Sequence, residues 1–444
     1  MNPPSPLPGK LLVRGIALAV ALGIWFAPVP EGLTPKAWHL FAIFGATILS
    51  VILTAFPLLT AAMIALAAAV LTGTVAPAKA FGGFANSSVL LVVIAFLVAR
   101  GVVKSGLGRR ISYMVVRLFG RSTLGLAYSI FFTDAVIAPA FPSNTARGGV
   151  LFPIVLALAE SGGSRPEDGT ARRMGAYLMF CGIASLSVSS ALWLTATSVN
   201  PIGVEIGGTF GVGASFGKWL LAASVPALTT ILLLPLVLYK IFPPEVKETP
   251  EAPAAAREAL RTMGPMSRDE KVVAVAFALM VTGWILAGTL NLDRTAVAFA
   301  GLGALLATSV LTLDDFTREG DTLATFLWLA VLFALSGQLN EMGFMGYVGE
   351  RLAAGLGGVS WPVAYVALVV LYVLMHYLFV SQSSQVLALF GVFLEVGIRT
   401  GVPKELIAFA LFFASSYFSA ITPQGGSQNV IFVGAGYNTQ GELY

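Results

Sequence analysis

The feature that most constrains this chain is a series of uninterrupted apolar runs, each close to the length of a helix that crosses a membrane. Such a helix needs about 20 apolar residues. The runs lie near residues 15–30, 38–56, 58–76, 87–103, 174–196, 218–242, 271–288, 295–312, 322–338 and 403–422. Only 11% of the residues are charged and the mean hydropathy is +0.85, whereas soluble domains spend about a quarter of their residues on charge. The sequence therefore predicts an all-α polytopic membrane protein, and continuous apolar runs exclude an alternating transmembrane barrel.

Two further apolar runs, at 123–160 and 362–398, are too long for one crossing, and each is interrupted by polar residues. The interruptions are the tripeptides Ser143-Asn144-Thr145 and Ser381-Gln382-Ser383. Pro142 precedes the first tripeptide, and proline disfavours helix at the residue before it. Ser, Asn and Thr then favour the start of a new helix. We therefore expect two re-entrant helical hairpins whose tips are these tripeptides.

The basic residues agree with this topology through the positive-inside rule. With a cytoplasmic N-terminus, the cytoplasmic segments receive most of the lysines and arginines, among them Arg109, Arg110, Arg172, Arg173 and Lys247. This sorting holds only if both long runs are hairpins that return to the side they enter from. We therefore expect the N-terminus to lie in the cytoplasm. The membrane is expected to be a bacterial inner (plasma) membrane. The net charge of +4 belongs to these loops, so nucleic acid is not expected as a partner.

The two halves of the chain follow the same order of segments. Ser143 follows Gly106 by 37 residues, and Ser381 follows Gly343 by 38. An amphipathic, interfacial segment lies between each glycine and its hairpin. Each half then has a span that breaks at a polar stretch, at 195–201 and at 422–429. The halves enter the membrane from opposite sides, so we expect an inverted repeat with two hairpins and two broken transmembrane helices, the commonest plan of secondary transporters.

The comparison of the two halves also predicts a linker between them and a further span after the second half. Residues 243–269, rich in Pro, Glu, Ala and Lys, form a cytoplasmic linker between the halves. The broken span of the first half is followed by the span 218–242, whereas the chain stops at Tyr444 soon after the second. Symmetry predicts a final span beyond Tyr444. The alternative is a short terminal helix over 430–444.

The polar breaks are the predicted ligand site, because irregular backbone at membrane depth must be buried or line a wet cavity. A half-helix N-terminus there favours an anion. The predicted ligand-binding residues are Ser143, Asn144, Thr145, Ser381, Gln382 and Ser383 from the tips, Thr197, Ser198 and Asn200 from the first broken span, and Gly426, Ser427 and Asn429 from the second. The alternative is that these side chains only hold helices together. Four breaks in matching register favour the ligand site.

Three ionisable residues in the hairpins have competing interpretations. Arg147 follows the first tip, and charge inside a membrane is costly and usually functional. It either attracts a dianion or stands where a co-transported cation would sit, and the alternative is a structural ion pair with Asp134. His376 and Glu395 lie in the second hairpin, where a hydrogen-bonded packing role is favoured over a proton relay.

Other classes of protein fit the sequence less well. A single cysteine and two histidines make a Cys- or His-rich metal site improbable. A channel needs a continuous lined pore, whereas paired breaks at one depth indicate a single occluded site. An intramembrane enzyme is also disfavoured, because the sequence shows neither a serine–histidine–aspartate constellation nor paired aspartates on neighbouring spans. We therefore expect a transporter of a small multivalent anion, with no enzymatic activity and no cofactor.

With these residues, the chain resembles the divalent anion–sodium symporter family over nearly its whole length. Ser143-Asn144-Thr145 matches the family signature of the first hairpin. The segments His376 to Ser383 and Val433 to Tyr437 resemble the branch of 2-oxoglutarate/malate translocators and citrate/succinate exchangers. The resemblance implies dicarboxylate substrates of the 2-oxoglutarate, malate and succinate type, surrounding membrane lipid, and a homodimer that works by an elevator mechanism.

The resemblance also implies a division into scaffold and transport parts. Residues 1–121 and 270–358 correspond to scaffold helices with an interfacial helix, residues 243–269 to the linker, and residues 122–242 and 359–444 to the two parts of the transport domain, the second lacking a final helix. Sodium-coupled relatives bind cations with hairpin and broken-helix oxygens, which here places a candidate Na⁺ site near Ser143, Asn144 and Ala196.

Two residues, Arg147 and Gln385, bear on whether transport is coupled to anion exchange or to sodium. Members that exchange anions without sodium carry an arginine where this chain has Arg147, and the exchanger branch often has a histidine where it has Gln385. One sodium-replacing charge is thus present and the other is absent. The second tripeptide also departs from the family's Ser-Asn-Thr. Anion exchange is the favoured mechanism, and sodium symport through one retained cation site is the alternative.

Overall fold

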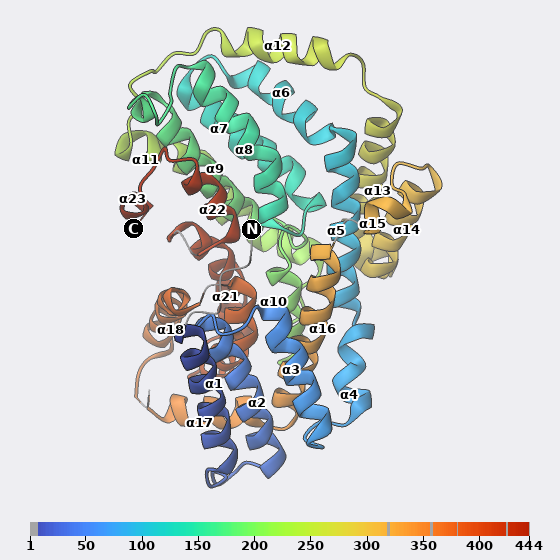
Figure 1. Cartoon of the computed structure of the whole chain (residues 1–444), viewed down its shortest axis with the longest axis vertical. Coiled ribbons are helices and arrows are strands. Elements are labelled where there is room, and N and C mark those ends of the chain that lie inside the picture. Colours follow the sequence, from blue (N-terminus) through green and yellow to red (C-terminus); the bar gives the residue numbers. More distant parts are fainter. Residues whose placement is uncertain (1–7, 318–319, 356–357, 380, 423–424, 444) are drawn as a thin grey trace. The chain divides into compact units, whose positions relative to one another are not determined.

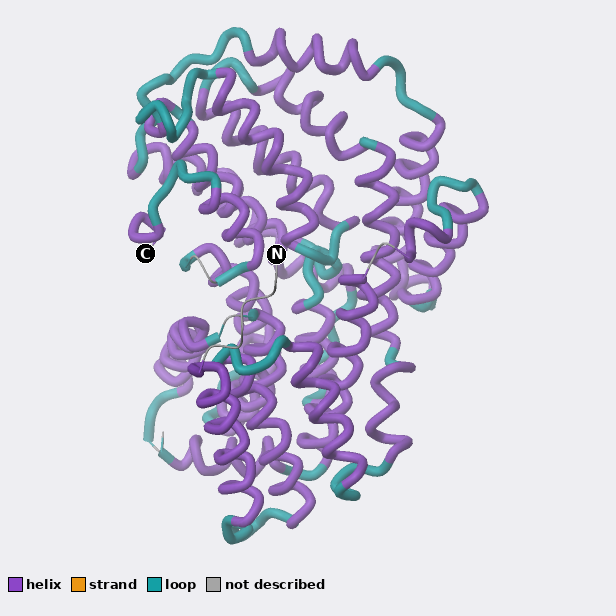
Figure 2. The backbone as a smooth tube through the Cα atoms, viewed as in Figure 1, coloured by secondary structure: helices purple, strands orange, loops and turns teal. Residues whose placement is uncertain are grey.

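The computed structural model describes residues 8–317, 320–355, 358–379, 381–422 and 425–443, and within these ranges the chain is built of helices, turns and loops with no strand (Figure 1, Figure 2). Eight helical segments in the described ranges are long and apolar enough to cross a membrane. They are Pro35–Ile52, Pro77–Ser105, Thr123–Ala140, Gly175–Leu192, Phe216–Ile241, Arg268–Leu290, Gly320–Glu341 and Trp361–Leu378. The predicted all-α polytopic fold is confirmed.

The chain divides into two compact units. Unit 1 contains Met1–Val93, Ile202–Gly213 and Glu319–Ala414, and unit 2 contains Ile94–Pro201, Ala214–Arg318 and Ser415–Tyr444. Three of the five boundaries fall within helices, namely α5 (Ser87–Ser105), α10 (Val199–Thr209) and α21 (Lys404–Tyr417). Because the division follows compactness alone, the predicted scaffold and transport parts stay a prediction.

Unit 1 holds the N-terminal helices and the second hairpin. Its helices are α1 (Pro8–Phe26), α2 (Pro35–Ile52), α3 (Leu58–Leu71), α4 (Pro77–Phe81), α16 (Gly320–Glu341), α17 (Phe344–Ala354), α18 (Trp361–Met375), α19 (Gln382–Gln385) and α20 (Gly391–Arg399). Helix α16 packs against α2, α3 and α17, and α20 packs against α17 and α18. The second hairpin is therefore supported on one side by the interfacial helix α17.

Unit 2 holds the first hairpin and the middle and end of the chain. Its helices are α6 (Leu107–Phe119), α7 (Thr123–Ile137), α8 (Asn144–Ser161), α9 (Gly175–Leu192), α11 (Phe216–Ile241), α12 (Ala252–Met263), α13 (Arg268–Leu290), α14 (Arg294–Ala307), α15 (Leu313–Thr317), α22 (Ser427–Gly434) and α23 (Gln440–Leu443). Both predicted interfacial segments are helices, α6 in this unit and α17 in unit 1.

Helix α9 is the core of unit 2, because every one of its residues is buried. Helices α7, α8, α11 and α22 pack around it. Small residues make this possible, as they do where membrane helices approach closely: a Cβ on Gly182 would lie 2.3 Å from the Phe432 ring. Helix α11, by contrast, exposes Leu221, Val225 and Leu228, as a helix facing lipid would. Because α7, α8, α11 and α22 surround α9, its polar residues are held at fixed positions inside unit 2.

The linker contains a helix that the sequence analysis did not foresee. Helix α12 occupies 252–263 and lies beside α6 (Figure 1). Arg110 of α6 is buried and donates to the Glu270 carboxylate at 2.6 Å and to the Gly264 carbonyl at 2.9 Å. Burial of the Arg110–Glu270 pair ties α6 to the start of α13, so the linker is anchored at its end.

Candidate functional site

The first predicted hairpin tip is the break between α7 and α8. Helix α7 ends at Ile137, a 3-10 turn covers Ala138–Ala140, and α8 begins at Asn144. Ser143 is the N-cap, with extended backbone and a side-chain oxygen that accepts from the Ala146 N–H at 3.2 Å. The prediction that the tripeptide starts a new helix is confirmed. First-turn N–H groups of a helix lack intrahelical partners, so this end attracts anions.

The second tip repeats this backbone in unit 1. Helix α18 has 15 residues, as α7 does, and is followed by a three-residue 3-10 turn. Ser381 is an extended N-cap whose side chain accepts from the Ser384 N–H at 3.4 Å. Beyond α19 the chain forms a π-helical segment, Val386–Phe390, whereas α8 continues as a regular α-helix. Ser383 is buried, and Gln382 is partly exposed.

The first broken helix is tied directly to the first tip. Helix α9 ends at Leu192 and α10 begins at Val199. The Ser198 N–H donates to the Pro142 carbonyl at 3.0 Å, and the Thr195 hydroxyl donates to the Pro139 carbonyl at 2.9 Å. The hairpin tip and the break between α9 and α10 therefore lie in contact, and Thr197 and Ala196 are buried beside them.

Asn200 bridges the two parts of this broken helix. Its amide nitrogen donates to the carbonyls of Ser190 at 2.7 Å and Trp193 at 3.0 Å, which end α9. Its oxygen accepts from the Ser416 hydroxyl at 3.2 Å. The side chain predicted to bind ligand is thus committed to satisfying backbone that the break leaves unpaired.

Asn429 does the same at the second break. Its amide nitrogen donates to the Ser419 carbonyl at 2.6 Å and the Thr422 carbonyl at 2.8 Å. The sequence separations are 10 and 7 residues, identical to those of Asn200 from its two acceptors. Gly426 is the N-cap of α22 with extended backbone, and the side chain of Ser427 lies outside what the structure describes. In both broken helices, therefore, an asparagine side chain donates to backbone carbonyls that the break leaves without helical partners.

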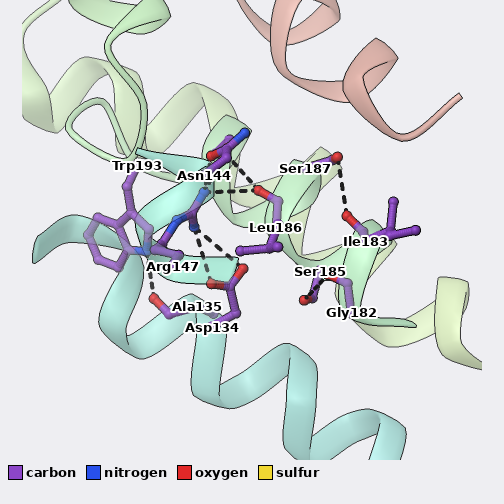
Figure 3. A network of polar contacts seen from close by, with 11 residues as sticks. Asp134, Ala135, Asn144, Arg147, Gly182, Ile183, Ser185, Leu186, Ser187 and Trp193 are labelled. Carbon is purple, nitrogen blue, oxygen red and sulfur yellow. Dashed lines mark hydrogen bonds and ion pairs between the residues drawn. The ribbon is translucent and has the colours of Figure 1, made fainter. Parts of the chain in front are cut away.

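Arg147 is the centre of a buried polar network in unit 2 (Figure 3). Its side chain is fully buried, and Nη1 lies 3.3 and 3.4 Å from the two carboxylate oxygens of Asp134, which is also fully buried. Nη2 lies 2.5 Å from Asn144 Oδ1, 2.5 Å from Ser190 Oγ and 3.0 Å from the Leu186 carbonyl. Figure 3 shows the guanidinium between the Asn144 amide and the Asp134 carboxylate. Arg147 therefore forms an ion pair with Asp134 and also contacts Asn144 of the hairpin tip.

Gln385 holds the corresponding place after the second tip. It is fully buried, and its amide nitrogen donates to the Tyr372 carbonyl at 2.8 Å. Its oxygen has no hydrogen-bond partner among the described residues. The second hairpin therefore carries a neutral amide and a spare acceptor where the first carries an ion pair.

Two buried amides beside the first tip have unused atoms in the described part of the chain. Asn144 Nδ2 has no partner, and neither has the oxygen or the nitrogen of Gln428. Gln428 is fully buried next to α8, since a Cβ on Gly148 would lie 3.4 Å from its own Cβ. Buried polar groups are normally satisfied, so such atoms need a ligand or water. The sequence analysis missed Gln428, although it lies in the second polar break, because only its burial distinguishes it.

The predicted ligand residues fall into both units. Unit 2 brings Ser143, Asn144, Thr145, Arg147, Thr197 and Asn200 together around one tip, and it also holds Gly426 and Asn429. Ser381, Gln382, Ser383 and Gln385 belong to unit 1. The meeting of the two tips stays a prediction.

The remaining ionisable candidates have local partners. His376 is buried, with Nδ1 2.5 Å from the Val373 carbonyl. Glu395 pairs with Arg399 one turn later at 2.5 Å. Among the described residues no group of three or more His, Cys, Asp or Glu side chains could hold a metal ion. A sodium ion at the first tip would have to rely on hydroxyl, amide and backbone oxygens, with the Arg147 cation close by.

Comparison with known proteins places this architecture in a family. Residues 9–444 match the family described as the sodium:sulfate symporter transmembrane region. The Bacillus subtilis (strain 168) transporter YflS, whose name gives malate as its candidate substrate, is 43% identical over 98% of this chain and 91% of its own length. Dicarboxylate transporter 1 of spinach (Spinacia oleracea) chloroplasts is 40% identical over 93% of this chain and 74% of its own.

A solved structure shares the fold. The crystal structure of the Alcanivorax borkumensis YdaH transporter, described as having an unusual topology, matches with a TM-score of 0.52 and 17% sequence identity, over 82% of this chain and 81% of its own. Family and relatives are transporters and not enzymes, as the sequence predicted. The chain is an integral membrane protein that belongs to the divalent anion–sodium symporter family, the family of the sodium:sulfate symporters.

Proposed function

We propose that this protein is a secondary active transporter of small dicarboxylate anions of the 2-oxoglutarate, malate and succinate type. The names of its relatives, which match it over most of their length, point to this substrate class. The anion binds at the first hairpin tip, where Ser143, Asn144 and Thr145 begin α8.

The observation that carries the proposal is the unused, buried donor of Asn144. Its Nδ2 has no partner within the described residues, and it lies at the start of an 18-residue helix, where the first-turn N–H groups lack intrahelical partners. Donors without acceptors in a buried place suit a carboxylate. No cationic side chain needs to touch the anion, since Arg147 is already paired with Asp134.

Anion exchange is the coupling mode that we favour. Arg147 supplies a permanent cation behind the tip, in the region where sodium-dependent relatives are expected to hold an ion. Its pairing with Asp134 keeps this charge inside the hairpin through a transport cycle. A homodimer that moves its hairpins by an elevator motion, with the N-terminus in the cytoplasm of a bacterial inner membrane, completes the proposal on the strength of the family resemblance and of the basic residues.

Sodium symport is the second candidate, and one observation favours it. Gln385 has a buried oxygen with no hydrogen-bond partner among the described residues, while its nitrogen is bonded to the Tyr372 carbonyl. An unused oxygen of this kind suits a hard cation such as Na⁺. A single retained sodium site at the second hairpin would therefore couple transport to the sodium gradient.

Uptake into proteoliposomes tests both candidates. Radiolabelled succinate, malate or 2-oxoglutarate is supplied to vesicles with or without internal unlabelled dicarboxylate, each with and without a sodium gradient. Exchange predicts uptake that needs internal anion and ignores sodium. Sodium-driven uptake into empty vesicles would favour symport, and no saturable uptake under any condition would contradict the substrate class.

A further inference from the structure

The Asn144 amide oxygen faces Arg147 and the Ser190 hydroxyl, on the side away from the proposed ligand. Arg147 Nη2 lies 2.5 Å and Ser190 Oγ lies 2.6 Å from the same atom, Asn144 Oδ1. Rotating the amide by half a turn would place its NH₂ group against the guanidinium, donor facing donor. The oxygen must therefore face Arg147 and the two N–H donors must face away from it.

Ser190 is held in place by the core helix. It lies near the end of α9, is fully buried, and its hydroxyl is 2.6 Å from the Leu186 carbonyl one turn earlier. Arg147 Nη2 donates to it at 2.5 Å. The hydroxyl thus accepts from Arg147 and donates either to Asn144 or to its own helix, which connects the hairpin tip to the buried centre of unit 2.

Asp134 fixes the other end of the guanidinium. Both of its oxygens lie within 3.4 Å of Nη1 from α7, the opposite arm of the hairpin. With Nη1 held by Asp134, Nη2 is directed at Asn144 and the Leu186 carbonyl (Figure 3). Nη2 also lies 2.5 Å from Ser190 Oγ. The chain of contacts runs from one hairpin arm, through Arg147, to the tip residue of the other.

We propose that Ser190 and Asp134 are positioning residues, which act through Arg147 and Asn144 to make the first tip a donor-only site for carboxylate. This inference rests on the proposed function. It assigns neither residue a contact with the anion. It predicts that the specificity for anions comes from a locked amide rotamer rather than from an exposed positive charge.

A double-mutant cycle tests this inference by measuring the dissociation constant of succinate for the purified full chain. Ser190→Ala should weaken binding about five- to tenfold, the scale of one hydrogen bond. In the Asn144→Ala background the same substitution should change binding less than twofold, because its effect is transmitted through the amide. Equal effects of Ser190→Ala in both backgrounds would overturn the inference. Ser190→Thr, which keeps the hydroxyl, should bind nearly as wild type does.

Two further variants keep the test decisive if an alanine variant is poorly folded. Ser185→Ala is the matched control, since Ser185 is equally buried on α9 but donates, among the described residues, only to the Gly182 carbonyl. The dissociation constant of succinate for this variant should be unchanged. Asn144→Asp keeps an acceptor for Arg147 but turns an oxygen toward the anion, so binding should fall at least about 100-fold. Normal succinate binding by Asn144→Asp would contradict the donor-only site. Failure of the wild-type protein to bind any dicarboxylate would instead refute the proposed function.

Discussion

The two hairpins have nearly the same backbone and different charge. Each has a 15-residue first arm, a three-residue 3-10 turn and an extended serine that caps the second arm. Four residues after that serine, the first hairpin has Arg147, paired with Asp134, and the second has Gln385, bonded to the Tyr372 carbonyl. One backbone plan therefore accepts either a buried ion pair or a neutral amide. The break itself comes from the cap and the turn, and the charge is an independent feature.

The largest expected effect is removal of one partner of the buried ion pair. Asp134→Ala leaves the Arg147 cation buried without its counter-ion, which costs about 3–5 kcal/mol of folding stability. We expect a large drop in melting temperature in detergent. The double variant Asp134→Leu, Arg147→Met should recover most of this loss, since well-packed apolar replacements of buried pairs are often neutral. If Asp134→Ala melts as the wild type does, the pair is not buried in the protein.

A smaller effect is expected from putting charge into the second hairpin. Gln385→Glu replaces the donor to the Tyr372 carbonyl with a buried carboxylate, which should cost at least about 2 kcal/mol. Gln385→Met, the matched control, loses only the hydrogen bond and should cost about 1 kcal/mol. Comparison of the two melting temperatures measures how strictly this hairpin must stay neutral. A Gln385→Glu variant more stable than wild type would reveal a cation there.

The bridging asparagines offer a finer comparison. Asn200 makes two donor bonds and accepts one from Ser416, whereas Asn429 makes two donor bonds and its oxygen is unused among the described residues. Asn200→Ala should therefore destabilise more than Asn429→Ala, by about 1 kcal/mol, one hydrogen bond. Asn340→Ala, which removes a single bond to Thr209, is the control. The reverse order would indicate that Asn429 has a partner that Asn200 lacks.

How much of the fold and of the candidate site could be predicted from the sequence depends on the kind of interaction involved. Proline, serine and the length of the apolar runs place the helices and both breaks, because helix starts are decided by local chemistry. The bridging role of Asn200 was not foreseen, since its acceptors are backbone carbonyls that become available only after α9 ends. Gln428 and Ser190 were missed for a related reason: burial by a neighbouring helix, not residue type, sets them apart. The helix α12 lies in a segment without a long apolar run, so hydropathy could not reveal it.

The smallest expected effect comes from an ion pair near the surface, which serves as a contrast to Arg147 and Asp134. Lys104 donates to Asp315 at 2.7 Å and, with donors from Thr312, lowers the pKa of Asp315 to about 2. A lowered carboxyl pKa adds stability above the ordinary value near 4 that is lost as pH falls from about 4 to 2. Solvent screening limits this to less than about 1 kcal/mol. Lys104→Met should lower the melting temperature slightly at pH 7 and not at pH 2; an equal effect at both would contradict the assignment.

The central claim is that the first hairpin carries its own cation and so binds the anion without sodium. The most direct measurement is the dissociation constant of succinate for the purified protein in sodium-free choline buffer and in sodium buffer of equal ionic strength. The account predicts values that agree within about twofold. Tightening by about fivefold or more in sodium, the usual size of coupling between two binding sites, would contradict it and make the protein a sodium symporter.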